Sequence, residues 1–330
     1  MKNILEYLFN HGRLSKEEAK NILVRIANRE FNNSQIMAFM TVFQMRPISV
    51  DELSGFREAL LELCIPVDLS EFDTIDMCGT GGDGKNTFNI STLSSFVVAG
   101  AGYKVAKHGN YGVSSISGSS NVLEAMGYQF TNDNKILKEQ IQDANITFLH
   151  APKFHPAMAA VGPVRKELGM KTFFNMLGPI VNPAKPQYQL VGVFNLELSR
   201  LYDYLFQDES DKKYAIIYGM DGYDEISLTG DFSIRDNTGQ HLLKPSDLGF
   251  EKINPADIHG GNSIEESAEI FRNILNGNGT DQQNNTVCAN AAMAIRVRNN
   301  LKQDFQECFE EAKESLFGGK ARKSLEMICA

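Results

Sequence analysis

One stretch of the sequence decides the fold, residues 74–92, which read TIDMCGTGGDGKNTFNIST. The apolar run at 74–78 predicts a buried strand. Glycines at 79, 81, 82 and 84 then let the backbone approach a ligand closely, and their N–H groups can form a nest for an anion. We expect Ser91 or Thr92 to cap the next helix, whose N-terminus carries the positive end of the helix dipole. The stretch therefore predicts a strand, a phosphate-binding loop and a helix in succession.

Two familiar nucleotide-binding motifs share residue types and spacing with this loop, but the sequence around it lacks other features that each motif needs. Gly79, Gly81 and Gly84 have the spacing of a dinucleotide fingerprint, which needs a helix directly after the glycines and an acidic residue about 20 positions later. Here the helix is expected near Ser91, and the later positions 104 and 107 are lysines. A P-loop at 79–85 is disfavoured because Asn86 stands where Ser or Thr would hold Mg²⁺.

The chain after residue 66 alternates short apolar runs with helical stretches. We expect strands at 74–78, 104–107, 146–150, 189–194 and 214–220, and helices at 92–101, 118–126, 134–143, 156–168 and 197–206. This alternation is typical of crossover units in a parallel sheet. Residues 226–243 resemble a hairpin, and a capping box at Ser263 begins a further helix, followed by a polar loop at 276–285. The predicted fold class is α/β, with a mainly parallel central sheet flanked by helices.

The first 65 or so residues contain only helical patterns. Ser15 and Ser49 are each followed by Glu three residues later, which is a capping-box pattern, and we expect Ser34 to cap a third helix. Short amphipathic helices bury little apolar surface alone, so these should pack on each other and on a partner surface. We therefore expect a small all-helical N-terminal domain before the larger α/β domain.

A second strand is expected to end in Lys107-His108-Gly109-Asn110, and a polar loop at 114–119 leads to another helix. Open α/β sheets bind ligands at the carboxyl ends of their strands. Two neighbouring strand ends, a lysine and two helix starts suit a ligand that carries two separate phosphate groups.

Acidic and basic side chains follow later strands and helices. Asp224 and Glu225 come just after the expected strand at 214–220, where adjacent carboxylates attract a hard cation such as Mg²⁺. Arg165 has a planar fork that can bind a carboxylate, although an exposed surface arginine is an equal alternative. His155 is expected at the start of the same helix, and His108 is a weak candidate for a proton acceptor. No nucleophile lies beside either histidine in sequence, so we see no pattern for covalent catalysis.

Composition excludes several classes of protein. The 330 residues carry a net charge of −9, which argues against a sequence-independent nucleic-acid binder or a polybasic membrane-surface protein. No apolar run approaches the ~20 residues of a spanning helix, and the start of the chain lacks the apolar region of a signal peptide. Five scattered cysteines without a C-x-x-C pair are typical of reduced thiols, so we expect a cytoplasmic protein.

Several motifs together resemble the anthranilate phosphoribosyltransferase family of tryptophan biosynthesis. They are GTGGD at 79–83, NIST at 89–92, KHGN at 107–110, SGS at 117–119, VRKELG at 164–169, FNMLGP at 174–179, NP at 182–183, DE at 224–225 and NAA at 290–292. The resemblance covers nearly the whole chain. It implies a helical domain at 1–70, with a contribution from about 160–185, and a phosphoribosyl-binding α/β domain at 71–330. It also implies a homodimer paired through the helical part.

The resemblance implies a reaction and a set of site residues. Anthranilate and 5-phosphoribosyl 1-pyrophosphate would give N-(5-phosphoribosyl)anthranilate and pyrophosphate, with Mg²⁺. Donor-binding positions would be Gly79, Gly82, Asp83, Thr87, Asn89, Ile90, Ser91, Thr92, Lys107, Ser115 and Ser119. Asn110 and Arg165 would contact anthranilate, and Ser91, Asp224 and Glu225 would hold Mg²⁺. The residues expected to act in catalysis are Arg165, Lys107 and His108.

The chain departs from the family pattern beside the site. Tyr111 stands where the family usually has Arg, Ile116 where Lys is common, and Ser120-Asn121 where Ala-Asp is common. Two positive charges are therefore missing. Two alternative functions remain: a pyrimidine nucleoside phosphorylase, whose phosphate and base motifs do not appear, and a nucleic-acid-binding paralogue, which the acidic balance disfavours.

Overall fold

The N-terminal part of the chain is a layer of four helices. The computed structural model describes residues 1–112 and 116–330. The four helices are α1 (Lys2–Phe9), α2 (Lys16–Ala27), α3 (Asn33–Met45) and α4 (Val50–Leu63). The capping boxes at Ser15 and Ser49 are confirmed. The prediction that Ser34 caps α3 is wrong, because Asn32 and Gln35 exchange the two capping hydrogen bonds and Ser34 lies inside the first turn.

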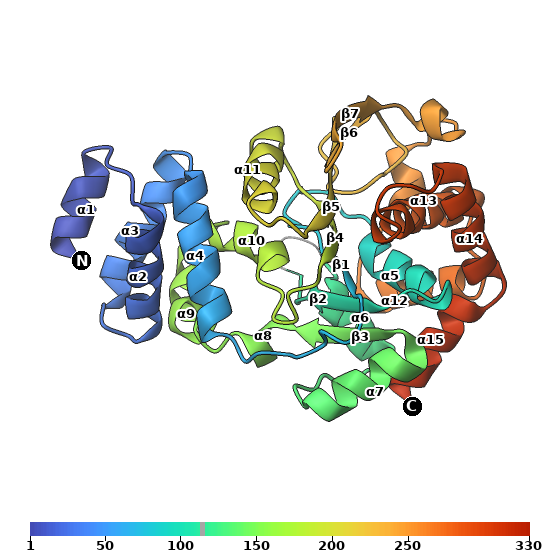
Figure 1. Ribbon diagram of the computed structural model, residues 1–330, viewed down its shortest axis with the longest axis horizontal. Coiled ribbons are helices and arrows are strands. Elements are labelled where there is room, and N and C mark those ends of the chain that lie inside the picture. Colours follow the sequence, from blue (N-terminus) through green and yellow to red (C-terminus); the bar gives the residue numbers. More distant parts are fainter. Residues whose placement is uncertain (113–115) are drawn as a thin grey trace.

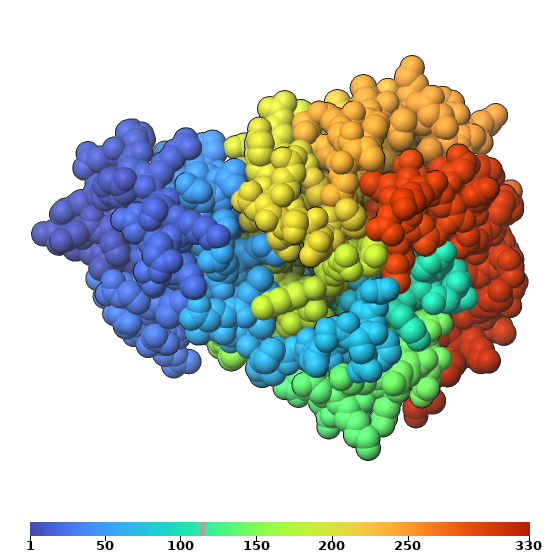
Figure 2. All heavy atoms as spheres, in the orientation of Figure 1, coloured from blue at the N-terminus to red at the C-terminus, as the bar shows by residue number. Residues whose placement is uncertain are grey.

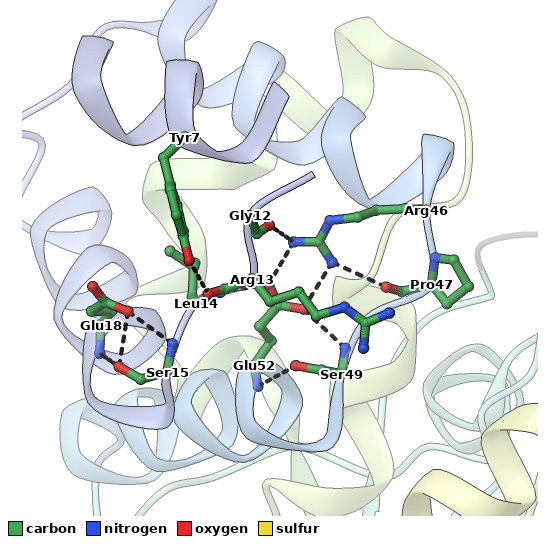
Figure 3. A network of polar contacts seen from close by, with 10 residues as sticks. All are labelled: Tyr7, Gly12, Arg13, Leu14, Ser15, Glu18, Arg46, Pro47, Ser49 and Glu52. Atoms are coloured by element: carbon green, nitrogen blue, oxygen red, sulfur yellow. Dashed lines mark hydrogen bonds and ion pairs between the residues drawn. The ribbon is translucent and has the colours of Figure 1, made fainter. Parts of the chain in front are cut away.

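A buried carboxylate joins the loops of this helical layer (Figure 3). Glu52 on α4 has no solvent exposure and accepts hydrogen bonds from the backbone N–H groups of Leu14 and Ser49, at 3.0 and 2.9 Å. Both outer nitrogens of Arg46 also bind it, at 2.9 and 2.6 Å. Burial raises the pKa of Glu52, but these hydrogen bonds outweigh burial and leave the pKa below its usual value. The network fixes the two inter-helix loops relative to α4.

One seven-stranded sheet forms the centre of the described chain. Its strands are β1 (Ile75–Met77), β2 (Val105–Gly109), β3 (Ile146–His150), β4 (Tyr188–Gly192), β5 (Lys213–Gly219), β6 (Phe232–Asp236) and β7 (Gly239–Leu243). The order is β3-β2-β1-β4-β5-β6-β7. Strands β1 to β5 pair in parallel, and β6 and β7 add an antiparallel hairpin at one edge. The predicted α/β class, the mainly parallel sheet and the hairpin are confirmed.

Helices cover both faces of this sheet (Figure 1). The helices after β1 are α5 (Ile90–Gly100), α6 (Ser119–Ala125), α7 (Asn134–Ala144), α8 (Ala151–Phe154), α9 (Met158–Leu168), α10 (Phe174–Leu177), α11 (Leu196–Gln207), α12 (Ile264–Leu275), α13 (Asp281–Arg298), α14 (Phe305–Phe317) and α15 (Lys320–Cys329). Short 3₁₀ turns lie at Gly178–Ile180, Pro245–Leu248 and Pro255–Ile258.

Two predicted boundaries among these helices are wrong. A helix was expected from 156, with His155 at its start, but α9 begins at Met158 and His155 ends the separate short helix α8. The loop expected at 276–285 stops at Thr280, whose side chain forms a capping box with Gln283 and begins α13. Residues 276–280 thus form the expected loop, whereas the polar residues 281–285 begin the long helix α13.

Alternate residues of the central strands enter different cores. Leu190 and Ile217 belong to the core formed with α5 and α12–α15, whereas Val191 and Ile216 belong to the core shared with α1–α4. This is the two-residue period of a sheet that is covered on both faces. A third, smaller core lies around Phe154. The N-terminal helices therefore pack on the α9–α11 side of the sheet.

Aromatic rings connect the N-terminal helices to the segment around α10. Phe56 of α4 stacks on Phe173, with ring centroids 4.6 Å apart, and Phe39 and Phe43 meet Phe173 edge-on. Figure 2 shows the N-terminal helices at one end of the molecule and the C-terminal helices at the other. Within the described residues, none of the helices is long and apolar enough to cross a membrane. The division into domains at residue 70 stays a prediction.

Candidate active site

A cavity of about 500 Å³ opens at the carboxyl ends of β1 and β2. From β1 the chain passes to β2 and β3 on one side, and later places β4 on the other side, so β1 marks the point where the strand order reverses. Open α/β sheets bind ligands at such a switch point. The glycine loop after β1, the 107–112 segment after β2 and residues of α9 and α10 line the cavity. The cavity therefore lies between the sheet and the helical layer.

The glycine loop has a backbone shape that other residues cannot easily adopt. Gly81, Gly82 and Gly84 have φ values of 58°, 76° and 75°, in the left-handed region that favours glycine. A Cβ atom at Gly79 would lie 2.7 Å from the Asp224 carboxylate. Residues 85–89 then lead from the glycine loop to α5, and residues of both the loop and the first turn of α5 line the cavity.

The cap of α5 differs from the prediction. Asn89 is the N-cap residue, and Ser91 and Thr92 lie within the first turn. The Asn89 side chain makes no capping bond and instead donates to the carbonyl oxygen of Ser117, at 3.0 Å. The prediction of a Ser91 or Thr92 cap is therefore wrong. Because Asn89 makes no capping bond, the first-turn N–H groups take other acceptors: that of Ile90 bonds the Phe88 carbonyl oxygen, at 2.6 Å, and that of Ser91 bonds Glu225.

Three carboxyl groups gather beside the loop. Asp224 accepts a hydrogen bond from the Gly81 N–H, at 2.8 Å, and burial together with the Asp83 charge raises its pKa to about 7. Burial and the Asp224 charge raise the pKa of Glu225 well above its usual value, and burial raises that of Asp83. Within the described residues, Glu225 Oε2 is buried without a hydrogen-bond partner. Such a cluster of carboxylates gains stability from a bound cation.

This donor set fits a hard divalent cation. Asp224 and Glu225 offer carboxylate oxygens, and Ser91, whose N–H group bonds Glu225, lines the same cavity. In residues 1–112 and 116–330, no group of three or more His, Cys, Asp or Glu side chains is arranged to hold a metal ion by itself. Mg²⁺ commonly uses one or two carboxylates, with waters and substrate phosphates as its other ligands, so an incomplete protein cage is compatible with it.

Lys107 lies beneath the loop rather than at its surface. Its side chain is only 2 % exposed, and Nζ donates to the carbonyl oxygen of Met77. Burial lowers its pKa, and nearby Cys78, Asp76, Glu225 and Asp224 act in the opposite direction. The ammonium thus supplies positive charge at the base of the carboxylate cluster.

His108 is fixed in one tautomer. Its Nδ1 lies 2.9 Å from the carbonyl oxygen of Gly178, which can only accept, so Nδ1 carries the proton. Burial lowers the pKa of His108 to about 3, with the neighbouring His155 adding to the effect. Its Nε2 is buried without a partner among the described residues. His108 is therefore neutral at physiological pH and presents a lone pair that can accept a hydrogen bond.

Arg165 projects from α9 into the cavity. Its Nη2 lies 3.4 Å from Asn175 Oδ1, and its guanidinium carbon lies 5.5 Å from the centre of the Phe174 ring. Burial lowers the pKa of the guanidinium. Within the described part of the chain Arg165 forms no ion pair, so its charge is partly desolvated without a carboxylate partner. This arrangement favours the carboxylate-binding alternative over a surface arginine.

Most of the predicted site residues meet in this one cavity. Its lining contains Gly79, Gly82, Asp83, Thr87, Asn89, Ser91, Thr92, Lys107, His108, Asn110, Ser119, Arg165, Asp224 and Glu225. Ile90 differs: its side chain is fully buried in the core behind α5, so it can offer the ligand only its backbone. Ser115 lies outside the described residues.

Sequence reasoning missed the apolar wall of the cavity. Phe174, Pro179 and Val181 line it from the segment after α9, and Met158 lines it from α9. The FNMLGP motif at 174–179 was a signal for this segment, but no pattern indicated that it would face the glycine loop. The contact depends on α9 and α10 returning to the edge of β1 and β2.

Known proteins resemble this chain over nearly its whole length. Residues 71–322 match the glycosyl transferase family α/β domain, and residues 2–64 match the helical bundle domain of that family. The chain is 62 % identical to an anthranilate phosphoribosyltransferase of Flavobacterium johnsoniae, over 99 % of this chain and 98 % of that protein. The protein of that name from Bacteroides fragilis is 52 % identical, over 98 % of both. This chain belongs to the anthranilate phosphoribosyltransferase family.

Solved structures of the family agree with this membership. The anthranilate phosphoribosyltransferase of Thermus thermophilus matches with a TM-score of 0.91 and 29 % identity, and the match covers 98 % of each chain. That of Saccharomyces cerevisiae, in complex with PRPP and Mg, matches with a TM-score of 0.89 and 27 % identity, over 98 % of this chain and 95 % of that one. The matches favour a transferase over the phosphorylase and nucleic-acid-binding alternatives, and they confirm the family resemblance.

Proposed function

We propose that this protein transfers the 5-phosphoribosyl group of 5-phosphoribosyl 1-pyrophosphate to the amino group of anthranilate and releases pyrophosphate. The observation that carries the proposal is one cavity with two chemically different walls. A glycine loop and a helix N-terminus form the wall on the sheet side, and Arg165 with apolar residues forms the wall on the helical side. The first wall suits a phosphorylated sugar, and the second suits an aromatic acid.

On the donor side we assign the residues that the family resemblance implies and that line the cavity. They are Gly79, Gly82, Asp83, Thr87, Asn89, Ser91, Thr92, Lys107 and Ser119. Backbone N–H groups of the loop and of the first turn of α5 would bind the phosphates. Lys107 would act through its charge, since its Nζ is already bonded to the Met77 carbonyl.

On the acceptor side Arg165 and Asn110 would hold anthranilate. The Arg165 fork would bind the carboxylate in two parallel hydrogen bonds, and Asn110, which lines the cavity opposite, would contact the same ring substituents. Phe174, Pro179 and Val181 would pack against the aromatic ring. Binding the carboxylate in a fixed orientation directs the neighbouring amine toward C1 of the ribose.

The chemical step is a displacement at C1. The lone pair of the neutral aromatic amine forms the C–N bond while the bond from C1 to the pyrophosphate oxygen breaks, and the pyrophosphate leaves with that electron pair. His108 is neutral and offers Nε2 as an acceptor, so it would orient an N–H of the amine. Once the C–N bond has formed, the nitrogen must lose one proton, and the departing pyrophosphate, a stronger base than His108, would take it. A cavity that excludes water limits hydrolysis of the donor.

We propose Mg²⁺ as the cofactor, held by Ser91, Asp224 and Glu225. Two features support this: the raised pKa values of the two carboxyl groups and the buried, unpartnered Glu225 oxygen. When bound, the ion would neutralise the charge that develops on the diphosphate.

We also propose that the protein is cytoplasmic and forms a homodimer that pairs through its helical layer. The domains of each chain would be residues 1–70 and 71–330. Residues from about 160–185 would contribute to the helical domain. Support for the pairing comes from the exposed apolar side chains Tyr7, Phe9 and Met45 on α1 and α3. Sedimentation of the purified protein tests the dimer: one species at the mass of a single chain would contradict it.

Loss of anthranilate fluorescence tests the activity directly. We expect the fluorescence to fall only when protein, 5-phosphoribosyl 1-pyrophosphate and Mg²⁺ are all present, with release of one pyrophosphate for each anthranilate consumed. Omitting each component in turn provides the controls. Persistent fluorescence in the complete mixture would refute the proposal, and phosphorolysis of a pyrimidine nucleoside or a salt-dependent DNA shift would favour the alternatives.

A further inference from the structure

Lys171, in the loop between α9 and α10, joins three parts of the molecule that meet at the cavity. Its Nζ donates to the carbonyl oxygen of Gly82 in the glycine loop. Its own carbonyl oxygen accepts a hydrogen bond from Gln44 Nε2 of α3, at 2.7 Å. The ammonium also lies 5.9 Å from the centre of the Phe194 ring, just after β4. One exposed lysine therefore links the helical layer, the phosphate-binding loop and the sheet.

We propose that Lys171 is a positioning residue that holds the phosphate-binding loop in its binding shape and adds positive charge for the diphosphate of the donor. This inference rests on the proposed function. It assigns a role to a residue that the sequence motifs left without one.

The hydrogen bond from Lys171 to the Gly82 carbonyl, which we call the tether, matters because glycines surround it. Gly81, Gly82 and Gly84 all have positive φ, and glycine backbones have many alternative conformations of similar energy. In a trans peptide the C=O and the following N–H point in opposite directions. When Lys171 holds the Gly82 carbonyl, it therefore also fixes the direction of the Asp83 N–H. The ammonium restricts the loop before a ligand binds, so the loop loses less conformational entropy on binding.

The charge matters because few cations lie on the donor side of this cavity: Lys85 lines it, and Lys85 and Lys171 both act to lower the pKa of Asp83. Tyr111 and Ile116 stand where the family commonly has basic residues. Lys107 is buried and its ammonium already binds a backbone carbonyl. The positive charge of Lys171 reaches the loop, since it acts to lower the pKa of Asp83. The ammonium, while bound to the Gly82 carbonyl, also attracts a nearby phosphate through its charge.

Three substitutions test the role of Lys171 and of its contact with α3. Lys171→Met keeps the aliphatic stem and removes both the charge and the hydrogen bond to Gly82. Lys171→Arg keeps a cationic donor, and Gln44→Ala keeps the charge but releases the loop from α3. Lys166→Met is the matched control, since Lys166 is an exposed lysine on the neighbouring helix α9.

The readout is the Michaelis constant of each substrate, measured by anthranilate fluorescence. We expect Lys171→Met to raise the KM of the donor about tenfold, which corresponds to ~1.4 kcal/mol. We expect the KM of anthranilate and kcat to change less than about twofold, because the acceptor binds the opposite wall. Lys171→Arg should restore most of the donor affinity, Gln44→Ala should have a smaller effect in the same direction, and Lys166→Met should match the wild type.

A merely structural lysine would give a different pattern. An unchanged donor KM in Lys171→Met, or an equal rise for both substrates, would overturn the proposal. Calorimetric titration with pyrophosphate and Mg²⁺ separates this result from failure of the proposed function. If the wild-type protein consumes no anthranilate, the function fails, and the titration still decides the role of Lys171: tenfold weaker pyrophosphate binding in Lys171→Met supports it, and equal binding contradicts it.

Discussion

Replacing Arg165 with alanine tests the assignment of the two cavity walls. Arg165 is partly buried on α9, its Nη2 has a long 3.4 Å contact with Asn175, and its guanidinium faces the Phe174 ring. None of the carboxylates in the described residues pairs with it. The guanidinium therefore keeps most of its hydrogen-bonding capacity for an incoming anion. If that anion is the anthranilate carboxylate, the substitution should affect one substrate and leave the other nearly unchanged.

The size of the effect follows from these contacts. A hydrogen bond to a charged group contributes about 1.5–3 kcal/mol, and the weak Asn175 contact is a small loss beside it. Since 1.4 kcal/mol corresponds to a factor of ten, the KM of anthranilate should rise roughly 10- to 150-fold. The KM of the donor should change less than about twofold, because the glycine loop and α5 do not contact Arg165 through any hydrogen bond in the described chain.

Steady-state fluorescence at varied concentrations of each substrate measures both constants. Arg165→Lys is the matched variant: it keeps the charge but loses the planar fork, so its anthranilate KM should lie between wild type and Arg165→Ala. Thermal unfolding of each variant checks that the fold is intact. Equal increases in both KM values, or an Arg165→Lys variant identical to wild type, would refute the carboxylate-orienting role.

Three other predictions concern the carboxylates and a buried histidine. Glu52→Gln leaves Arg46 without its buried anionic partner and should lower the free energy of unfolding by about 3–5 kcal/mol in urea titrations; a loss under about 1 kcal/mol would contradict the network. Burial lowers the pKa of His150 to about 4, so the folded state stays neutral where the unfolded imidazole takes a proton. Stability should therefore fall as pH drops from about 6.5 toward 4, and His150→Gln should reduce that slope by ~1.4 kcal/mol per pH unit; identical slopes would count against it. Asp224→Asn combined with Glu225→Gln should raise the half-saturating Mg²⁺ concentration about tenfold or more, and an unchanged metal titration would exclude these ligands.

Local sequence chemistry was sufficient for much of the fold. The capping boxes at Ser15 and Ser49, the strand runs and the glycine loop were all predictable, because each depends on residues within a few positions of one another. The errors were local as well. Asn32 caps α3 in place of Ser34, and a polar run after Thr280 is helical because α13 is buried by tertiary packing rather than selected by its own propensity.

The candidate site divides in the same way. Their expected places at strand ends brought Asp83, Lys107 and Asp224 into one hypothesis, since the carboxyl ends of parallel strands meet at one edge of a sheet, and the family resemblance added Arg165. Sequence reasoning did not reveal that Lys107 is turned onto a backbone carbonyl.

The sequence by itself determined which chemical groups are available: a loop that can bind anions, a pair of adjacent carboxylates and a planar guanidinium. What only the tertiary structure decided is which of these groups face one another and in what state of charge. His108 is neutral because burial withdraws it from water, and Lys171 reaches Gly82 because α3 and the sheet bring distant segments together. The first depends on desolvation and both depend on long-range packing, which arises from contacts between residues far apart along the chain and therefore leaves no local pattern in it.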